Sequence, residues 1–430
     1  MKIGVRLACL CCLVGPIGLF SPSASGQFQR VLDIEQPPFL YSQTQPENRV
    51  SRLLEALRSQ KLELEYTHQQ GNLESLLVAL EIPVTSQVLV FSKTSLQVRY
   101  ISSRNPRAIY FNDDTYLGWV YGSSLVEIST ADPKLGTAFY TIDMSPMHPK
   151  LQQAYYDCMA CHATSLTQGI PGHTVRSVIP TYDGTVDPRR ESFITDDRSP
   201  LKERWGGWYV TGLHGEMVHM GNTILSNDRF DITNNGNRKH LRDEFDTSHY
   251  LSPYSDIVAL MVLEHQTQMH NSLIRADFFV RQLQYETRTD EPTVEFKAER
   301  QQQLRLIAKE VVDRMLFRHA APLTSQVSGS VKFAEQFASR GPKDAQGRSL
   351  RDFDLETRLF RYPCSFLIYS TTFDALQSEL RDEIYRQLKQ VLSPKDSSGP
   401  PLADDYPHLS PEMRADILEI LAHTKTGWPN

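Results

Sequence analysis

The chain has 430 residues, of which 40% are hydrophobic and 22% are charged, with 25 prolines and 22 glycines. This is the composition of a globular protein, and it excludes collagen-like, low-complexity and wholly disordered chains. With 45 Lys and Arg against 51 Asp and Glu the net charge is −6, so charge argues against a nucleic-acid partner and we expect none.

Residues 1–26 are predicted to form a secretory signal peptide. Two basic residues precede an apolar stretch at 7–20, and small residues follow at Ala24 and Gly26. This order of basic, apolar and small residues is typical of export signals. The alternative is an uncleaved membrane anchor, but the apolar stretch is shorter than the ~20 residues of a spanning helix. We predict a mature chain that begins at Gln27, has no transmembrane segment, and is periplasmic or secreted.

Loss of the signal peptide changes the cysteine count. Three of the six cysteines lie within it, together with two basic and no acidic residues, so the net charge goes from −6 to −8. The mature chain keeps Cys158, Cys161 and Cys364. Exported proteins can form disulfides, but three cysteines do not make a disulfide framework. We therefore expect another role for the close pair, and a buried free thiol for Cys364.

Residues 27–143 read as a mixed α/β region. Two short helices are expected, one at 48–57 and one that begins near Leu73 and runs to 80. Runs rich in β-branched and aromatic residues then predict strands at 88–91, 109–111, 116–120 and 138–141.

Residues 144–225 form the region that contains the close cysteine pair. Residues 226–430 are predicted to be mainly helical. Pro149 is expected to open a short helix through Tyr156, because proline is favoured at the first helical position. Residues 163–250 are rich in Gly, Pro, Asp and Asn and predict structured loops with short strands. Apolar spacing and capping residues then predict helices at 256–285, 304–319, 373–391 and 411–423. The predicted fold class is α+β.

The motif that decides the chemistry is Cys158-Met-Ala-Cys161-His162. In a Cys-x-x-Cys-His motif two thiols form thioethers with the vinyl groups of haem, and the adjacent histidine becomes the proximal iron ligand. Two alternatives compete. A redox or disulfide pair of the thioredoxin type needs its first thiol at a helix N-terminus after a strand. Here we expect a helix before the pair, and Asp157 would raise the pKa of the neighbouring Cys158 thiol, so both features argue against a redox pair. A zinc site needs four ligands, and no second spaced pair completes one.

Residues 149–162 resemble the first helix and attachment loop of a single-haem c-type cytochrome. The resemblance covers about 75 residues, from Pro149 to Asn222, and implies that residues 144–225 are a cytochrome c-like haem-binding region. The whole chain is also similar to exported bacterial proteins that carry one haem motif. The resemblance implies one covalent haem c, a proline carbonyl (here Pro171) on the Nδ1–H of His162, and a sixth ligand some 60 residues downstream. The candidates in that segment are Met220 first, then His219, Met217 and His214.

Arg204, Trp205 and Trp208 are candidates for haem lining, since Trp N–H groups and arginine can hydrogen-bond the propionates. The alternative is an aromatic strand in the core. The sequence predicts an exported c-type cytochrome that transfers electrons to or from an unknown redox partner protein. A haem enzyme, peroxidase-like or acting on another small molecule through an open or displaceable distal position, is the alternative. The catalytic residues of such an enzyme stay open.

Overall fold

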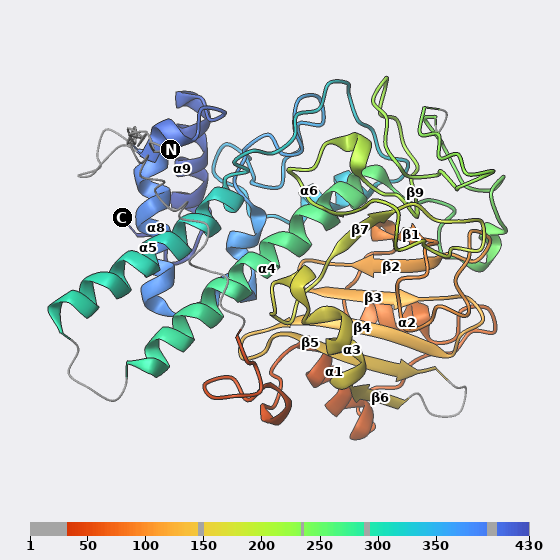
Figure 1. Ribbon diagram of the computed structural model, residues 1–430, viewed down its shortest axis with the longest axis horizontal. Helices are drawn as coiled ribbons and strands as arrows, with labels where there is room; N and C mark the ends of the chain where they lie inside the picture. The colour runs from red at the N-terminus through yellow and green to blue at the C-terminus, as the bar shows by residue number, and fades with distance from the viewer. Residues whose placement is uncertain (1–31, 145–149, 234–235, 288–292, 394–401, 430) are drawn as a thin grey trace, which may run out of the picture. The chain divides into compact units, whose positions relative to one another are not determined.

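The computed structural model describes residues 32–144, 150–233, 236–287, 293–393 and 402–429. Its centre is an antiparallel sheet, seven-stranded over these ranges, with the order β6-β5-β4-β3-β2-β1-β9 (Figure 1). The strands are β1 (Val88–Val90), β2 (Arg107–Phe111), β3 (Thr115–Trp119), β4 (Leu125–Asp132), β5 (Gly136–Asp143), β6 (Lys150–Gln153) and β9 (Trp208–Tyr209). Sequence neighbours pair from β1 to β6, whereas β9 returns from far along the chain to pair with β1.

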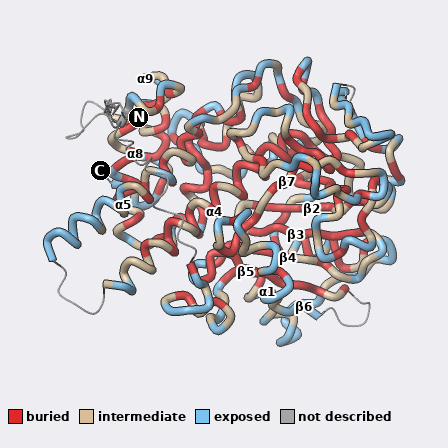
Figure 2. The backbone as a smooth tube through the Cα atoms, in the orientation of Figure 1, coloured by how far each residue is buried: buried red, intermediate tan, exposed pale blue. Residues whose placement is uncertain are grey.

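One face of this sheet carries the hydrophobic core. Alternate residues of the strands point to it, because side chains in a strand alternate between faces. Helices α1 (Arg49–Arg58) and α2 (Leu73–Ala79) cover that face. Fully buried members of this cluster include Val50, Leu76, Tyr110, Leu117 and Val126. Figure 2 shows that most residues of the central strands are buried.

The opposite face of the sheet is covered by a different set of elements. The short helix α3 (Tyr156–His162) follows β6, and a small hairpin of β7 (Val175–Val178) and β8 (Ser192–Thr195) lies beyond it. The long helix α4 (Ile257–Glu286) packs on β7. Asp256 caps α4: its side chain accepts hydrogen bonds from the backbone N–H groups of Val258 and Ala259.

The C-terminal half is helical, as the sequence predicts. After α4 come α5 (Val294–Met315), α6 (Phe333–Ser339), α7 (Thr371–Asp374), α8 (Ser378–Leu392) and α9 (Pro411–Thr424). Helix α5 packs against both α4 and α8, and α9 packs against α8. The α+β class is therefore confirmed. No helix of the described residues is long and apolar enough to cross a membrane.

The expected helix before the cysteine pair is wrong. Pro149 lies outside the described residues, and Lys150–Gln153 form strand β6, which pairs with β5 through contacts such as Ile142 opposite Leu151. Edge pairing with β5 overrides the local helix signal of the proline. The helix starts only at Tyr156. The segment after the motif has the predicted loops and short strands, and it contributes β9 to the sheet. The predicted signal peptide falls outside the described residues.

Candidate functional site

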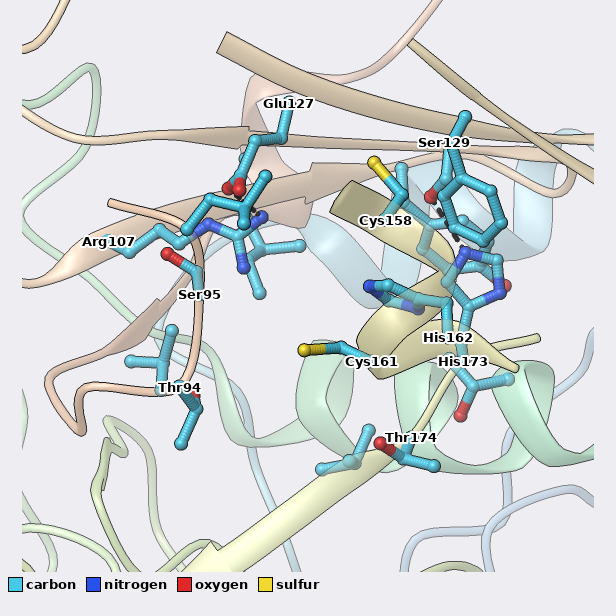
Figure 3. Close-up of a pocket in the computed structure, with 18 of the residues that line it drawn as sticks. Thr94, Ser95, Arg107, Glu127, Ser129, Cys158, Cys161, His162, His173 and Thr174 are labelled. Carbon is cyan, nitrogen blue, oxygen red and sulfur yellow. Dashed lines mark hydrogen bonds and ion pairs between the residues drawn. The ribbon is translucent and has the colours of Figure 1, made fainter. Parts of the chain in front are cut away.

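A cavity of about 330 Å³ lies between the sheet, on the side opposite α1 and α2, and the elements that cover that side. Its size is within the range of about 300–1,000 Å³ typical of ligand pockets. Strands β2 to β5, helix α3, the segment Thr94–Leu96, strand β7 and helix α4 all contribute side chains to its lining. Figure 3 shows the wall around α3.

Both cysteines and the histidine of the motif line this cavity. They occupy positions i, i+3 and i+4 of α3, which places them on one side of the helix. Cys158 is buried, Cys161 is exposed, and both thiols are free of disulfides. Figure 3 shows the sulfur of Cys161 and the ring of His162 pointing into the space in front of α3. The fold thus presents two thiols and one imidazole to a single cavity.

The ring of His162 is fixed by a backbone carbonyl. Its Nδ1 lies 2.8 Å from the carbonyl oxygen of Gly172, and the N–H of Gly172 donates back to the carbonyl of His162 at 2.9 Å. The expected acceptor was Pro171; the structure gives this role to the next residue. With Nδ1–H donated, Nε2 is left as the lone-pair nitrogen of a neutral imidazole. Burial lowers the pKa of His162, which favours this neutral form.

Gly172 is itself positioned by helix α4. A Cβ at residue 172 would come within 3.0 Å of Asn271 Oδ1. Asn271 accepts a hydrogen bond from the backbone N–H of His173 at 3.0 Å and donates to its carbonyl at 2.6 Å. A glycine is needed here because the backbone approaches the asparagine too closely for a side chain. These two hydrogen bonds from Asn271 on α4 to the backbone of His173 form a clamp. The clamp fixes the position of the Gly172 carbonyl, which in turn holds His162.

His173 stands beside His162 on the cavity wall. Their ring centroids are 5.8 Å apart, and His173 Nε2 lies 2.7 Å from Ser129 Oγ on β4. Tyr116 packs on the ring of His173 at 4.5 Å between centroids. Burial, followed by the nearby His162 and His270, lowers the pKa of His173 well below its usual value, so the ring is neutral. The hydrogen bond to Ser129 and the packing of Tyr116 hold the His173 ring in the cavity wall.

An ion pair that was not predicted from the sequence lies on the cavity side of the sheet. Arg107 on β2 and Glu127 on β4 both line the cavity, and Arg107 Nη2 lies 2.6 Å from Glu127 Oε2. The strand between them has Gly118 at the intervening position, opposite Glu127 in the register. A Cβ on Gly118 would overlap the guanidinium of Arg107, so the glycine lets the arginine lie flat across β3. Charged residues within β-rich runs were the signal that could have revealed the pair.

Of the three residues predicted to line the haem, only Trp208 borders the cavity. Its indole N–H donates to the carbonyl of Arg176 at 2.8 Å. Arg204 is buried elsewhere: Nη1 contacts Glu264 Oε2 at 3.1 Å, and its other nitrogens donate to the carbonyls of Ser199 and Asp197. Trp205 is fully buried against His219. The structure places Arg204 and Trp205 in the core, the alternative given above.

The four predicted sixth-ligand residues cluster together but none is among the residues that line the cavity. Met220 is buried, and its sulfur accepts a hydrogen bond from Ser177 at 3.4 Å. The sulfur of Met217 lies 3.4 Å from the N–H of Thr324. Both ring nitrogens of His214 face backbone carbonyls, and the ring centroids of His214 and His219 are 4.7 Å apart. Burial lowers the pKa of His219 to about 3. Trp208, earlier in the same part of the chain, does border the cavity, whereas these four residues do not.

The environment of Cys158 bears on the redox-pair alternative. The pair does lie in a strand-then-helix context, since α3 follows β6. Burial, with Glu127 and Asp157 adding to it, nevertheless raises the pKa of Cys158 to about 11. A redox-active thiol of the thioredoxin type needs a lowered pKa, so this environment opposes that chemistry.

A covalent haem fits these residues. Among the described residues no group of three or more His, Cys, Asp or Glu is arranged to hold a metal ion directly; haem iron, in contrast, takes four nitrogens from its own ring and needs one from the chain. The cavity mouth includes Leu96 and Leu166, which are 48% and 44% exposed. A planar apolar group seated beside α3 would cover such side chains.

No family model, curated protein or solved structure matches the chain.

Proposed function

We propose that the protein is an exported c-type haem protein that carries one covalent haem and transfers electrons. Cys158 and Cys161 would form the two thioethers, and His162 would be the proximal ligand. The observation that carries the proposal is that all three line one cavity while the carbonyl of Gly172 holds the Nδ1–H of His162. An acceptor at that position fixes the tautomer and the orientation of an iron-binding histidine.

The haem would supply a one-electron couple, and the chain would supply binding, orientation and shielding. The face of Phe139 lies beside His162, with ring centroids 4.7 Å apart, which limits rotation of the imidazole. Val175, Leu263 and Ile109 add apolar lining. Such lining keeps water away from the reacting centre and adjusts its potential.

Haem staining after denaturing electrophoresis tests covalent attachment. We expect the wild-type chain, produced with a haem-attachment system, to give a stained band, and Cys161→Ser to remove or greatly weaken it. Cys364→Ser is the matched control, because Cys364 is a buried free thiol away from the cavity, and it should stain as strongly as the wild type. A colourless wild-type band would refute the proposal.

Export is the second part of the proposal, supported by the sequence of residues 1–26. Haem c is attached outside the cytoplasm, so export and the motif point to the same location. N-terminal sequencing of the mature protein should begin at or near Gln27. Recovery of Met1 on the protein in a membrane fraction would contradict this part.

A haem enzyme with an open distal position is the second candidate. The lining favours it, because no methionine of the described residues borders the cavity, whereas two arginines and a glutamate do. The visible spectrum separates the two candidates: a low-spin haem indicates a closed electron carrier, and a high-spin haem indicates an open site. Met220→Ala decides the ligand hypothesis, since it should turn a low-spin spectrum high-spin only if Met220 is the sixth ligand.

A further inference from the structure

We propose that Arg107 and Glu127 form a binding site for a small inorganic anion on the side of the haem opposite His162. The proposal rests on the covalent haem of the proposed function and on the open distal position of the second candidate, since the haem would lie between His162 and the ion pair. The anion would bind the iron through one atom and accept a hydrogen bond from the guanidinium. Arg107 is the binding residue, and Glu127 is a positioning residue that holds it.

The placement of the ion pair is the first support. Figure 3 shows Arg107 and Glu127 on the wall across from α3, in the direction in which Cys161 and His162 point. The charges of both residues act on the pKa values of Cys158 and His162, so the two walls are within electrostatic reach of each other. A group attached to α3 would therefore lie against this pair.

The hydrogen-bonding capacity of Arg107 is the second support. A guanidinium has five N–H donors. Glu127 Oε2 takes one of them, at Nη2. Arg107 Nε is buried over Gly118 and is out of a ligand's reach. The Arg107 side chain is nevertheless 19% exposed and lines the cavity, so the Nη groups are the donors that can serve a ligand lone pair there.

The rigidity of the arrangement is the third support. Glu127 is held from a second side by Gln97 Nε2, 3.2 Å from the same carboxylate oxygen. Beneath the guanidinium, Gly118 allows close contact with the backbone of β3. A donor fixed by its surroundings loses little conformational freedom on binding, which favours affinity.

Azide is the probe for this site, and its binding to the oxidised haem protein is followed by visible absorbance. We expect saturable binding to the wild type. Arg107→Gln should raise the dissociation constant for azide by about 10- to 100-fold, which is the loss of affinity expected for one hydrogen bond from a charged donor. Glu127→Gln and Glu127→Ala both remove a negative charge beside the anion, so the positioning role is read from the difference between them: Gln keeps an acceptor for Arg107 and should bind azide more tightly than Ala.

Two further variants separate position from charge. Gly118→Ala keeps the arginine but pushes its guanidinium off β3, so it should weaken azide binding without removing a charge. Arg176→Gln removes a cation from another part of the same lining and should leave the dissociation constant unchanged. Equal effects of Arg107→Gln and Arg176→Gln would mean a general charge effect and would overturn the inference.

The remaining outcomes are also distinct. A colourless wild-type protein refutes the proposed function and the inference together. A haem-loaded wild type that is low-spin and does not bind azide overturns the inference alone, because the sixth position is then filled. If Arg107→Gln shifts the reduction potential but not the azide constant, the arginine pairs with a haem propionate, and the anion site is refuted.

Discussion

The clamp between Gly172 and Asn271 gives the sharpest prediction for the proximal side of the site. In Gly172→Ala the new Cβ would come within 3.0 Å of Asn271 Oδ1, so the asparagine must move. Its two hydrogen bonds to the backbone of His173, at 3.0 and 2.6 Å, would then stretch or break. Gly172 does not have a left-handed φ, so the backbone itself accepts alanine.

The magnitude follows from those two hydrogen bonds. Each contributes about 1 kcal/mol net, and a buried group left without a partner costs about 1–3 kcal/mol. We expect Gly172→Ala to lower the free energy of unfolding by about 2–4 kcal/mol. In an Asn271→Ala background the clash is gone, and the same change should be neutral or stabilising by about 0.5 kcal/mol, because alanine restricts the unfolded chain.

Urea unfolding of the two single variants and the double variant measures this coupling as a double-mutant cycle. Gly122→Ala is the control, because Gly122 has φ +82° and no neighbour near its Cβ position; it should cost about 1 kcal/mol in both backgrounds. If the effects of Gly172→Ala and Asn271→Ala simply add, the clamp does not set the position of residue 172, and the account of how His162 is held fails.

Three further predictions concern the supporting structure and are checked by urea unfolding. Asp256→Ala should cost about 3 kcal/mol, because the carboxylate accepts hydrogen bonds from four backbone N–H groups; a change below 1 kcal/mol would contradict this. Arg204→Met should cost about 3–5 kcal/mol by leaving Glu264 buried without its partner, and R204M/E264L should recover the part due to Glu264 but not the part due to the carbonyls of Ser199 and Asp197; loss of haem without loss of stability would instead restore the propionate role. Burial tends to raise the pKa of Asp197, but His265 and a nearby arginine outweigh it and lower the pKa to about 2. Its contribution is therefore present above about pH 4 and is lost as the pH falls toward 2, so Asp197→Asn should flatten that acid-dependent loss; an unchanged profile would refute the assignment.

Helices with strong local signals were predictable from the sequence. Helix α4 was expected at 256–285 and runs from Ile257 to Glu286, and α9 begins at Pro411 after the expected cap Ser410. A capping side chain and the following apolar spacing are local properties, which sequence patterns report well. The expected helix at 373–391 divides into α7 and α8, where a turn interrupts a continuous apolar pattern.

Strand β4 was missed although it is one of the longest and pairs with its sequence neighbours β3 and β5, so a distant partner does not explain that miss. Strand β9 is different: it has two residues, Trp208 and Tyr209, whose partners Val90 and Leu89 lie more than a hundred positions earlier. A strand of that length has no local pattern of its own, since pairing with β1 stabilises it.

The residues of the candidate site also differ in whether the sequence reveals them. Cys158, Cys161 and His162 are adjacent in sequence, so one motif identifies them. Arg107 and Glu127 meet only because the register of three strands sets Gly118 between them. No spacing in the sequence encodes that meeting, which appears only when the sheet is assembled.

The two faces of the sheet show why the ion pair bears on function. The face toward α1 and α2 is packed with apolar side chains such as Leu117 and Val126, which is what stability alone requires. On the other face, Arg107 and Glu127 are largely removed from water, with side-chain exposures of 19% and 15%. A partly buried ion pair stabilises a fold little, and apolar residues of similar volume often serve as well. Since folding does not require charges on this wall, and the wall faces the two thiols and the imidazole, the ion pair is best explained by what binds in the cavity.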